Sequence, residues 1–363
     1  MRKGLTMPVY DETQFPAPLD PEQFEPDEYA TALSGRNLAI QAVAKGILSR
    51  AEVIDQIKGI AREQGASESR SIELITTGSD GRFEKGPTSP VDVIVLLSRK
   101  VRDGVAKQME TELEATLAKS VEVTYLDAEL EQRLDPTPIF SNVEVKNLAD
   151  GPLMYFERNK ARWALWPSRL IDAAPLIRDG DCLLDAARTQ LYQEITENSR
   201  LILEVEKERR RNFAVTTRGT QEDPTKVGTN RMKGNRIVQF SLEDGMAFYD
   251  PSGHQTSFKH GPLRLVQAGL QIEAFQTMDS TVICNLPSPT IDKIFFLHDL
   301  GVIQANYTEM LEFAQLYRYF LWQYHRSEYA YRMEGATSVS FDPIQVRENL
   351  LAITRLEEQL RGK

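Results

Sequence analysis

One stretch of the sequence, residues 78–97, constrains the fold more than any other part of the chain. It reads Gly-Ser-Asp-Gly-Arg-Phe-Glu-Lys-Gly-Pro-Thr-Ser-Pro-Val-Asp-Val-Ile-Val-Leu-Leu. A short apolar run at 72–77 precedes it, and a second apolar run at 91–97 forms its end. Apolar runs of this length beside turn residues are typical of buried strands. The stretch therefore predicts two β-strands joined by a turn-rich loop.

The loop between the two predicted strands is rich in glycine. Gly78, Gly81 and Gly86 can adopt backbone angles that are closed to other residues. The main-chain N–H groups around Gly78 and Ser79 can then point at an anion. A phosphate group suits such a loop, so we expect the chemistry of the protein there.

This stretch resembles the nucleotidyltransferase superfamily, in which a strand, a Gly-Gly or Gly-Ser pair and a loop precede two carboxylates one residue apart on the next strand. It is most similar to the branch of bacterial nitrogen-regulatory uridylyltransferases and adenylyltransferases and related signalling nucleotidyltransferases. That branch reads Gly-(Gly/Ser)-x-Gly-Arg-x-Glu-x-x-Pro-x-Ser-Asp-x-Asp. The positions that match it without a gap are Gly78, Ser79, Gly81, Arg82, Glu84, Pro87, Ser89 and Asp92.

The first carboxylate of the pattern is replaced by Pro90, which cannot coordinate a metal ion. In this superfamily, divalent ions held by carboxylate oxygens polarise the α-phosphate and stabilise the leaving pyrophosphate. The resemblance therefore implies Mg²⁺ and a nucleoside triphosphate (NTP) as cofactors, with Asp92 as a catalytic and metal-binding residue. Asp80 and Glu84 are nearby acids that could replace the lost ligand, although the Glu84 position is structural in the family pattern.

The resemblance also implies a further carboxylate on a central strand. Residues 141–148 alternate in polarity and predict such a strand. Glu144 is the candidate for this catalytic and metal-binding role, with Glu122 as its substitute, and an acid on a solvated strand face is an equally good explanation of each. Asp172 is another candidate, but its match lies in a turn that can be purely structural.

The predicted nucleotide-binding residues are Gly78, Ser79, Gly81, Arg82, Ser89 and Lys233. Arg82 either faces the phosphates or forms a salt bridge with Glu84, and the salt bridge is the preferred prediction. Lys233 belongs to the segment 215–234, which is rich in Thr, Gly and Lys and predicts a mobile basic loop. Such a loop can act as a lid over a triphosphate or be a plain surface loop.

Two later segments extend the resemblance to roughly residues 70–270. Residues 166–181 are similar to the family turn that precedes a Gly-Asp pair and a helix. Residues 259–267 are similar to a Gly-Gly-Leu-Arg-Asp element of the helical part that follows the catalytic domain, but the family Asp is Leu265 here.

The length of 363 residues predicts about two domains. We expect an α+β protein with a nucleotidyltransferase-like mixed β-sheet and flanking helices, followed by a helical domain. The predicted parts are an extended, poorly packed N-terminal arm that can dock locally (1–26), the nucleotidyltransferase-like domain (27–180) and a mainly helical domain (181–363). Hydrophobic periodicity predicts helices at 29–48, 50–64, 102–119, about 182–213, 290–300, 307–333 and 342–361, a strand at 121–126 and a short hairpin within 237–249.

The composition narrows the classes of function. The 43 Lys and Arg against 53 Asp and Glu give a net charge of −10, which does not favour nonspecific binding to nucleic acid or to an anionic membrane. No apolar run approaches the roughly 18 residues that a transmembrane helix needs. With only Cys182 and Cys284, the chain has no disulfide framework and no metal-spaced cysteine cluster, so we expect a cytoplasmic protein.

The sequence thus favours transfer of a nucleoside monophosphate from an NTP to a protein or small-molecule acceptor. The alternative is a catalytically inactive nucleotidyltransferase-like regulator or protein-interaction module, because Pro90 and Leu265 stand where the family has carboxylates. A host-directed bacterial effector with the same core chemistry is a third reading.

Overall fold

The computed structural model describes residues 16–48, 71–86, 93–97, 143–147, 170–180, 182–197, 215–216, 226–233, 236–241, 246–248, 258–336 and 338–360, with single residues at 55, 59, 207 and 210. These residues belong to two compact units. The first unit comprises 1–17, 35–85 and 89–194, and the second comprises 18–34, 86–88 and 195–363. The predicted domain bounds, 26/27 and 180/181, stay predictions.

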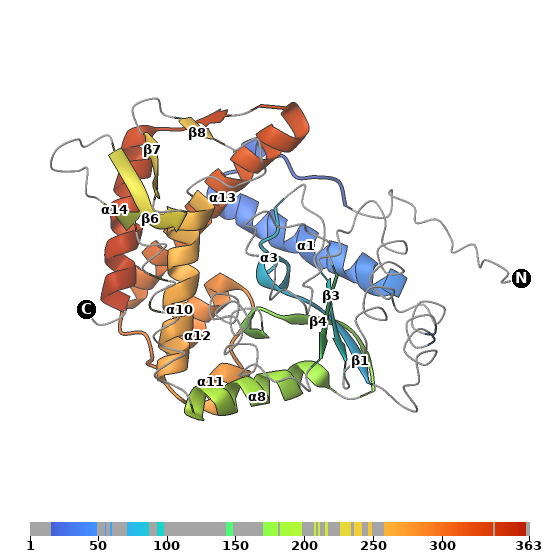
Figure 1. The fold of residues 1–363 in the computed structure, drawn as a ribbon. Coiled ribbons are helices and arrows are strands. Elements are labelled where there is room, and N and C mark those ends of the chain that lie inside the picture. Colours follow the sequence, from blue (N-terminus) through green and yellow to red (C-terminus); the bar gives the residue numbers. More distant parts are fainter. Residues whose placement is uncertain are drawn as a thin grey trace, which may run out of the picture. The chain divides into compact units, whose positions relative to one another are not determined.

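The first unit contains a four-stranded mixed sheet (Figure 1). Its strands are β1 (Ile72–Thr76), β2 (Val93–Leu97), β3 (Val143–Asn147) and β4 (Ala174–Asp179), in the spatial order β3-β2-β1-β4. β1 is antiparallel to both β2 and β4, whereas β2 and β3 are parallel. The strands predicted at 72–77, 91–97 and 141–148 are therefore confirmed, and β4 is an addition to the predicted set.

β1 is buried along its whole length, as expected for a central strand that reads as a continuous apolar run. Its charged residue is Glu73, whose side chain is fully buried. Glu73 accepts a hydrogen bond from Arg178 Nε of β4 (3.2 Å) and one from the Leu184 N–H (2.8 Å) in the first turn of α8 (Leu183–Glu197). The carboxylate raises the pKa of the Arg178 guanidinium and complements the positive end of the helix. Glu73 thus joins the sheet to α8.

The helix α1 (Pro26–Leu48) confirms the helix predicted at 29–48 and begins slightly earlier. Pro26 suits a first helical position because its fixed φ is already helical, and the first turn is acidic, which complements the helix dipole. The boundary between the two units falls within α1, after Ser34.

The second unit is built mainly from helices (Figure 1). They are a π-helical turn, η4 (Lys259–Leu263), and the helices α10 (Arg264–Gln276), α11 (Ser280–Cys284), α12 (Thr290–Asp299), α13 (Tyr307–Glu334) and α14 (Pro343–Leu360). The helices predicted at 290–300, 307–333 and 342–361 are confirmed. The aromatic rings of α13 fill the core, as Tyr317 and Phe320 show by their complete burial.

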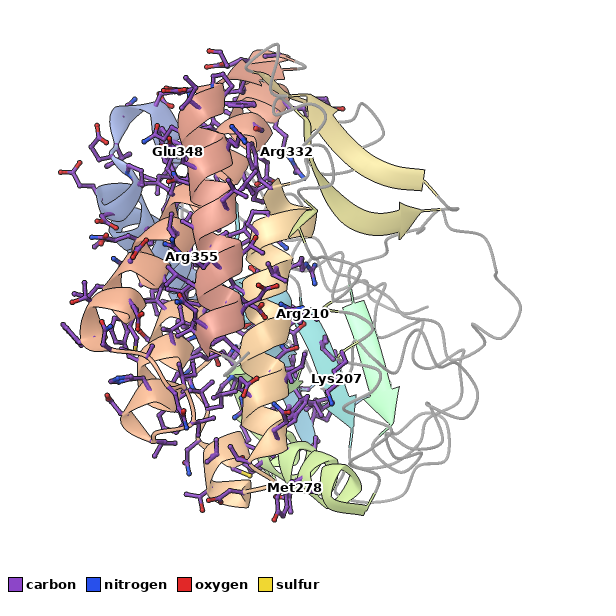
Figure 2. The ribbon with its side chains drawn as sticks, turned by 90° about the vertical axis from the view of Figure 1, so that its left-hand side faces the viewer. Lys207, Arg210, Met278, Arg332, Glu348 and Arg355 are labelled. Carbon is purple, nitrogen blue, oxygen red and sulfur yellow. The ribbon has the colours of Figure 1, made fainter. Side chains whose placement is uncertain are left out.

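An ion pair accompanies the packing of α10 and α14, which lie side by side (Figure 2). Arg210 donates through Nε to Glu357 Oε1 of α14 (2.7 Å). Gly269 of α10 leaves room for this carboxylate, because a Cβ there would lie 2.6 Å from Glu357 Oε1. The absence of a side chain at Gly269 therefore gives the Glu357 carboxylate its place beside α10.

The described part of the N-terminal arm docks on α13. Trp322 Nε1 donates to the carbonyl of Pro21 (2.8 Å), in the short 3-10 helix η2 (Pro21–Gln23). Arg326 forms an ion pair with Glu22 and also lies over the Trp322 ring, 4.5 Å from its centroid. α13 thus holds this segment through the Trp322 indole N–H and the Arg326 guanidinium, and the Trp322 ring supports that guanidinium from within the helix.

The segment 215–234 is wrongly predicted as a loop. It contributes β5 (Val215–Thr216) and β6 (Lys226–Lys233) to a three-stranded antiparallel sheet with β7 (Arg236–Ser241). The hairpin predicted within 237–249 is also wrong, because β7 pairs with β6 whereas β8 (Met246–Phe248) pairs with β9 (Ser338–Ser340). Gly and Lys are infrequent in strands, so the composition of this segment did not predict β5 and β6. Pairing with neighbouring strands decides strand formation more than the intrinsic β-propensity of the residues does.

The protein is α+β. Among the described residues, no helix has both the length and the apolar character needed to cross a membrane. The elements predicted at 50–64, 102–119 and 121–126 lie outside the described residues, apart from the helical positions 55 and 59. The helix predicted at about 182–213 is described as α8 and at the helical positions 207 and 210.

A buried tyrosine provides a test of the second unit. The Tyr317 hydroxyl of α13 accepts from Gln267 Nε2 of α10 (2.8 Å) and donates to Thr290 Oγ1 of α12 (3.1 Å). Because Tyr317→Phe removes both hydrogen bonds at a buried position, we expect the free energy of unfolding to fall by about 1–3 kcal/mol. Urea denaturation measures this change. Tyr307→Phe, at a largely exposed position, is the control and should shift stability by less than about 0.5 kcal/mol.

Candidate functional site

The glycine loop, residues 78–86, begins one residue after the end of β1. It opens with a single helical turn, α3 (Gly78–Gly81), in which the Arg82 N–H donates to the Gly78 carbonyl (3.1 Å). The Glu84 N–H then donates to the Ser79 carbonyl (2.8 Å). These bonds fold the predicted loop into a compact turn of fixed shape.

Two glycines of the loop are required for different reasons. Gly78 has φ +60°, in the left-handed region, and a Cβ there would meet nothing within 4 Å. Gly81 has an ordinary φ, but a Cβ there would lie 1.6 Å from the carbonyl oxygen of Asp172. The loop therefore presses on the residues before β4 at Gly81 and borders open space at Gly78.

A buried arginine joins the loop to the turn before β4. Arg82 Nε donates to Glu84 Oε2 (2.8 Å), and Arg82 Nη1 forms an ion pair with Asp172 Oδ2. All three side chains are less than 10% exposed. The predicted salt bridge between Arg82 and Glu84 is confirmed. Asp172 is a partner of the same guanidinium, which gives this carboxylate a structural role.

A second ion pair lies within the loop. Lys85 Nζ donates to Asp80 Oδ2 (3.0 Å), and the Asp80 side chain is only 4% exposed. Asp80 and Glu84, which could replace the carboxylate that the resembled pattern has at position 90, are therefore each paired with a cation of the loop itself. This pairing reduces their availability to a metal ion.

The loop is also held by α1. Asn37 Nδ2 donates to the carbonyls of Phe83 and Lys85, both at 3.0 Å, and Gln41 Nε2 donates to the carbonyl of Asp80 (2.7 Å). Sequence reasoning missed both residues. The available signal was their spacing of four, which places two amides on one face of a helix.

The predicted site residues that the structure describes divide into three groups. Gly78, Ser79, Gly81 and Arg82 come together in the glycine loop. Glu144 lies on β3, directly opposite Ile94 of the parallel strand β2. Lys233 is the last residue of β6, in the second unit, opposite Arg236. Asp92, Ser89 and Glu122 lie outside the described residues.

Other kinds of site find little support in the part of the chain that the structure describes. No group of three or more His, Cys, Asp or Glu side chains there is arranged to hold a metal ion. Burial and a hydrogen bond to Asp185 raise the pKa of the Cys182 thiol, so this sulfur is protonated at neutral pH. A protonated thiol is a poor nucleophile.

No protein-family model matches the chain, and a search of curated proteins finds no match.

Gly81 provides a first test of the loop packing. Gly81→Ala should lower the free energy of unfolding by about 1–3 kcal/mol, because the new methyl group collides with the Asp172 carbonyl. Gly35→Ala, in the interior of α1 with open space around its Cβ position, should raise it by about 0.5–1 kcal/mol. Opposite signs in urea denaturation are expected, and equal effects of the two substitutions would contradict the packing described.

Arg82 provides a second test. Arg82→Met leaves Glu84 and Asp172 buried without the cation between them, so we expect a loss of about 3–5 kcal/mol of stability. Arg318→Met breaks an ion pair with Asp27, which is more than half exposed, and should cost about 1 kcal/mol or less. Thermal and urea denaturation of both variants give the comparison. A loss of similar size in the two variants would argue against the buried network.

Proposed function

We propose that this chain is a nucleotidyltransferase-like protein that transfers a nucleoside monophosphate from an NTP, with Mg²⁺, to a protein or small-molecule acceptor in the cytoplasm. The observation that carries the proposal is the position of the glycine loop. Gly78 and Ser79 are separated from β1 by Thr77 alone, and the chain then continues from the loop to Asp92, the residue before the antiparallel strand β2.

The proposed metal site uses Glu144 of β3 and Asp92, the residue before the neighbouring strand β2. Glu144 is opposite Ile94, and side chains two residues apart on a strand share a face. The proposal therefore requires Asp92 to lie on the same face as Ile94 and Glu144. The strand spacing and the rise per residue would then separate the two Cα atoms by about 8 Å, within reach of two carboxylates that share one ion.

Mg²⁺ would neutralise charge on the phosphates as the bond to the leaving pyrophosphate breaks. The residues of this chain would bind and orient the substrate. The loop N–H groups and the Ser79 hydroxyl would donate hydrogen bonds to phosphate oxygens, and the open space beside Gly78 provides room for them. Since Asp80, Glu84 and Asp172 already have cationic partners, the metal charge would rest on Asp92 and Glu144.

A second candidate function is a regulatory or protein-interaction module without catalysis. It is favoured by Leu265, which stands where the resembled pattern has Asp and is fully buried in α10. A carboxylate could not be placed there without a large desolvation cost, so this position of the helical unit has an apolar structural role. The proline at position 90 favours the same reading.

Calorimetric titration with nucleotides distinguishes the proposed transferase from the module without catalysis. Purified protein is titrated with ATP, UTP, CTP and GTP, each with and without Mg²⁺. We expect Mg²⁺-dependent binding of at least one nucleotide and at least a tenfold loss of affinity in Asp92→Ala. Asp299→Ala removes an acid that is 78% exposed in the second unit, so this control should bind as the wild type does.

Three outcomes are informative. Loss of binding in Asp92→Ala alone supports the transferase and justifies a search for the acceptor with labelled nucleotide. Binding that needs neither Mg²⁺ nor Asp92 supports an inactive nucleotide-binding module. Absence of binding by all four nucleotides overturns the transferase and leaves the protein-interaction module.

A further inference from the structure

We propose that Asn37 and Gln41 of α1 are positioning residues, which set the direction of the backbone amides in the glycine loop for the triphosphate. This inference rests on the proposed function, because the loop is the part that would bind the phosphates. Neither residue belongs to the sequence pattern of the loop, and both act through its backbone rather than on a ligand.

Asn37 is held in one orientation by its surroundings. Its side chain is nearly fully buried, and Nδ2 donates to two carbonyls, those of Phe83 and Lys85. A carboxamide nitrogen has two hydrogens, so these bonds use its whole donor capacity. The reverse orientation would place the amide oxygen against two carbonyl oxygens, which makes the observed one the only favourable choice.

The hydrogen bond from Asn37 to the Phe83 carbonyl also influences the start of the loop, through planar peptide groups. Because a trans peptide fixes its C=O and N–H in opposite directions, holding the Phe83 carbonyl orients the Glu84 N–H. That N–H donates to the Ser79 carbonyl (2.8 Å), and the Ser79 carbonyl shares a peptide plane with the Asp80 N–H. Asn37 is therefore two peptide groups away from the Asp80 amide.

Gln41 influences the start of the loop in the same way, through a second series of peptide groups and hydrogen bonds. Its Nε2 holds the Asp80 carbonyl, which orients the Gly81 N–H of the same peptide plane. The Gly81 N–H donates to the Thr77 carbonyl (3.3 Å), whose peptide plane contains the Gly78 N–H. The two connections thus end on the amides of Gly78 and Asp80, on either side of Ser79. Hydrogen bonds in series polarise one another, which strengthens the arrangement.

The loop needs such support because one of its residues has an unfavourable conformation. Phe83 has φ +58°, in the left-handed region that residues with a side chain rarely adopt. Asn37 binds the carbonyl of Phe83 and the carbonyl two residues later. The spacing of four puts the Asn37 and Gln41 amides one helical turn apart, on a regular helix, and regular elements position groups more accurately than loops do.

The test replaces the amide groups of Asn37 and Gln41 by side chains that cannot donate a hydrogen bond. Asn37→Asp keeps the shape of the side chain but puts acceptors against the Phe83 and Lys85 carbonyls. Gln41→Met removes the donor at a half-buried position and is the milder variant, which keeps the test usable if Asn37→Asp does not fold. Ala39→Asp adds a carboxylate to an exposed position of the same helix and is the matched control.

Hydrogen–deuterium exchange and nucleotide titration are measured on the full chain. We expect the amides of residues 78–85 to exchange at least tenfold faster in Asn37→Asp and in Gln41→Met, and Mg²⁺-NTP affinity to fall at least tenfold, with Ala39→Asp unchanged in both. Folded variants whose loop exchanges at the wild-type rate overturn the positioning role. Faster exchange with unchanged affinity overturns its link to the ligand.

The two proposals can fail separately. If the wild-type protein binds no nucleotide, the proposed function is overturned, and with it the role of the amides toward a triphosphate. The exchange rates then still decide whether α1 holds the loop. If the wild type binds and the positioning variants bind equally well, only the positioning role is overturned.

Discussion

The pairing of Arg82 with two buried carboxylates is the interaction on which the first unit most depends. A guanidinium, Glu84 and Asp172 lie together with little exposure to water, and burial of each such charge costs several kcal/mol unless it is paired. The planar, forked guanidinium can meet two carboxylates at once, which the ammonium of lysine does less well. The same contact brings the loop so close to the residues before β4 that only glycine fits at position 81. The ion pairs of Arg82 therefore hold the glycine loop against the residues that lead into β4.

This arrangement separates the structural acids from those proposed for chemistry. Asp80, Glu84 and Asp172 each have a cation in contact, whereas the two acids proposed for the metal ion are Glu144 on β3 and Asp92, which precedes β2 in the sequence. A metal ion competes poorly for a carboxylate that already has a buried partner, because the displaced cation would be left without one. Whether an acid has a structural role therefore depends on the side chains in contact with it. Its place in the sequence pattern alone does not decide this.

The sequence predicted those features that depend on local pattern. The apolar runs gave β1 and β2, and apolar periodicity gave α12, α13 and α14, with Asn306 and Glu309 forming a capping box at the start of α13. Features that depend on distant partners were missed. β4 contains Pro175 and exposed positions and is a strand because β1 pairs with it. Asn37 and Gln41 look like ordinary polar positions of a helix until the loop carbonyls are placed beside them. Arg82 and Glu84 were predictable as a pair because they are two residues apart, whereas Asp172 is ninety positions away.

Backbone strain in the glycine loop bears on whether this loop binds a ligand or has only a structural role. Gly78 and Phe83 are both in the left-handed region, and for a residue with a side chain such a conformation costs about 1–3 kcal/mol. Part of this cost is offset by the Asn37 and Gln41 hydrogen bonds, at about 1 kcal/mol each. At Gly78 there is no packing reason for glycine, because a Cβ would meet nothing, so the conformation rather than the space excludes a side chain. A loop that contains a strained residue and is held by α1 and by the turn before β4 is preorganised in the way that ligand sites often are. This preorganisation agrees with the ligand-binding role proposed for the loop.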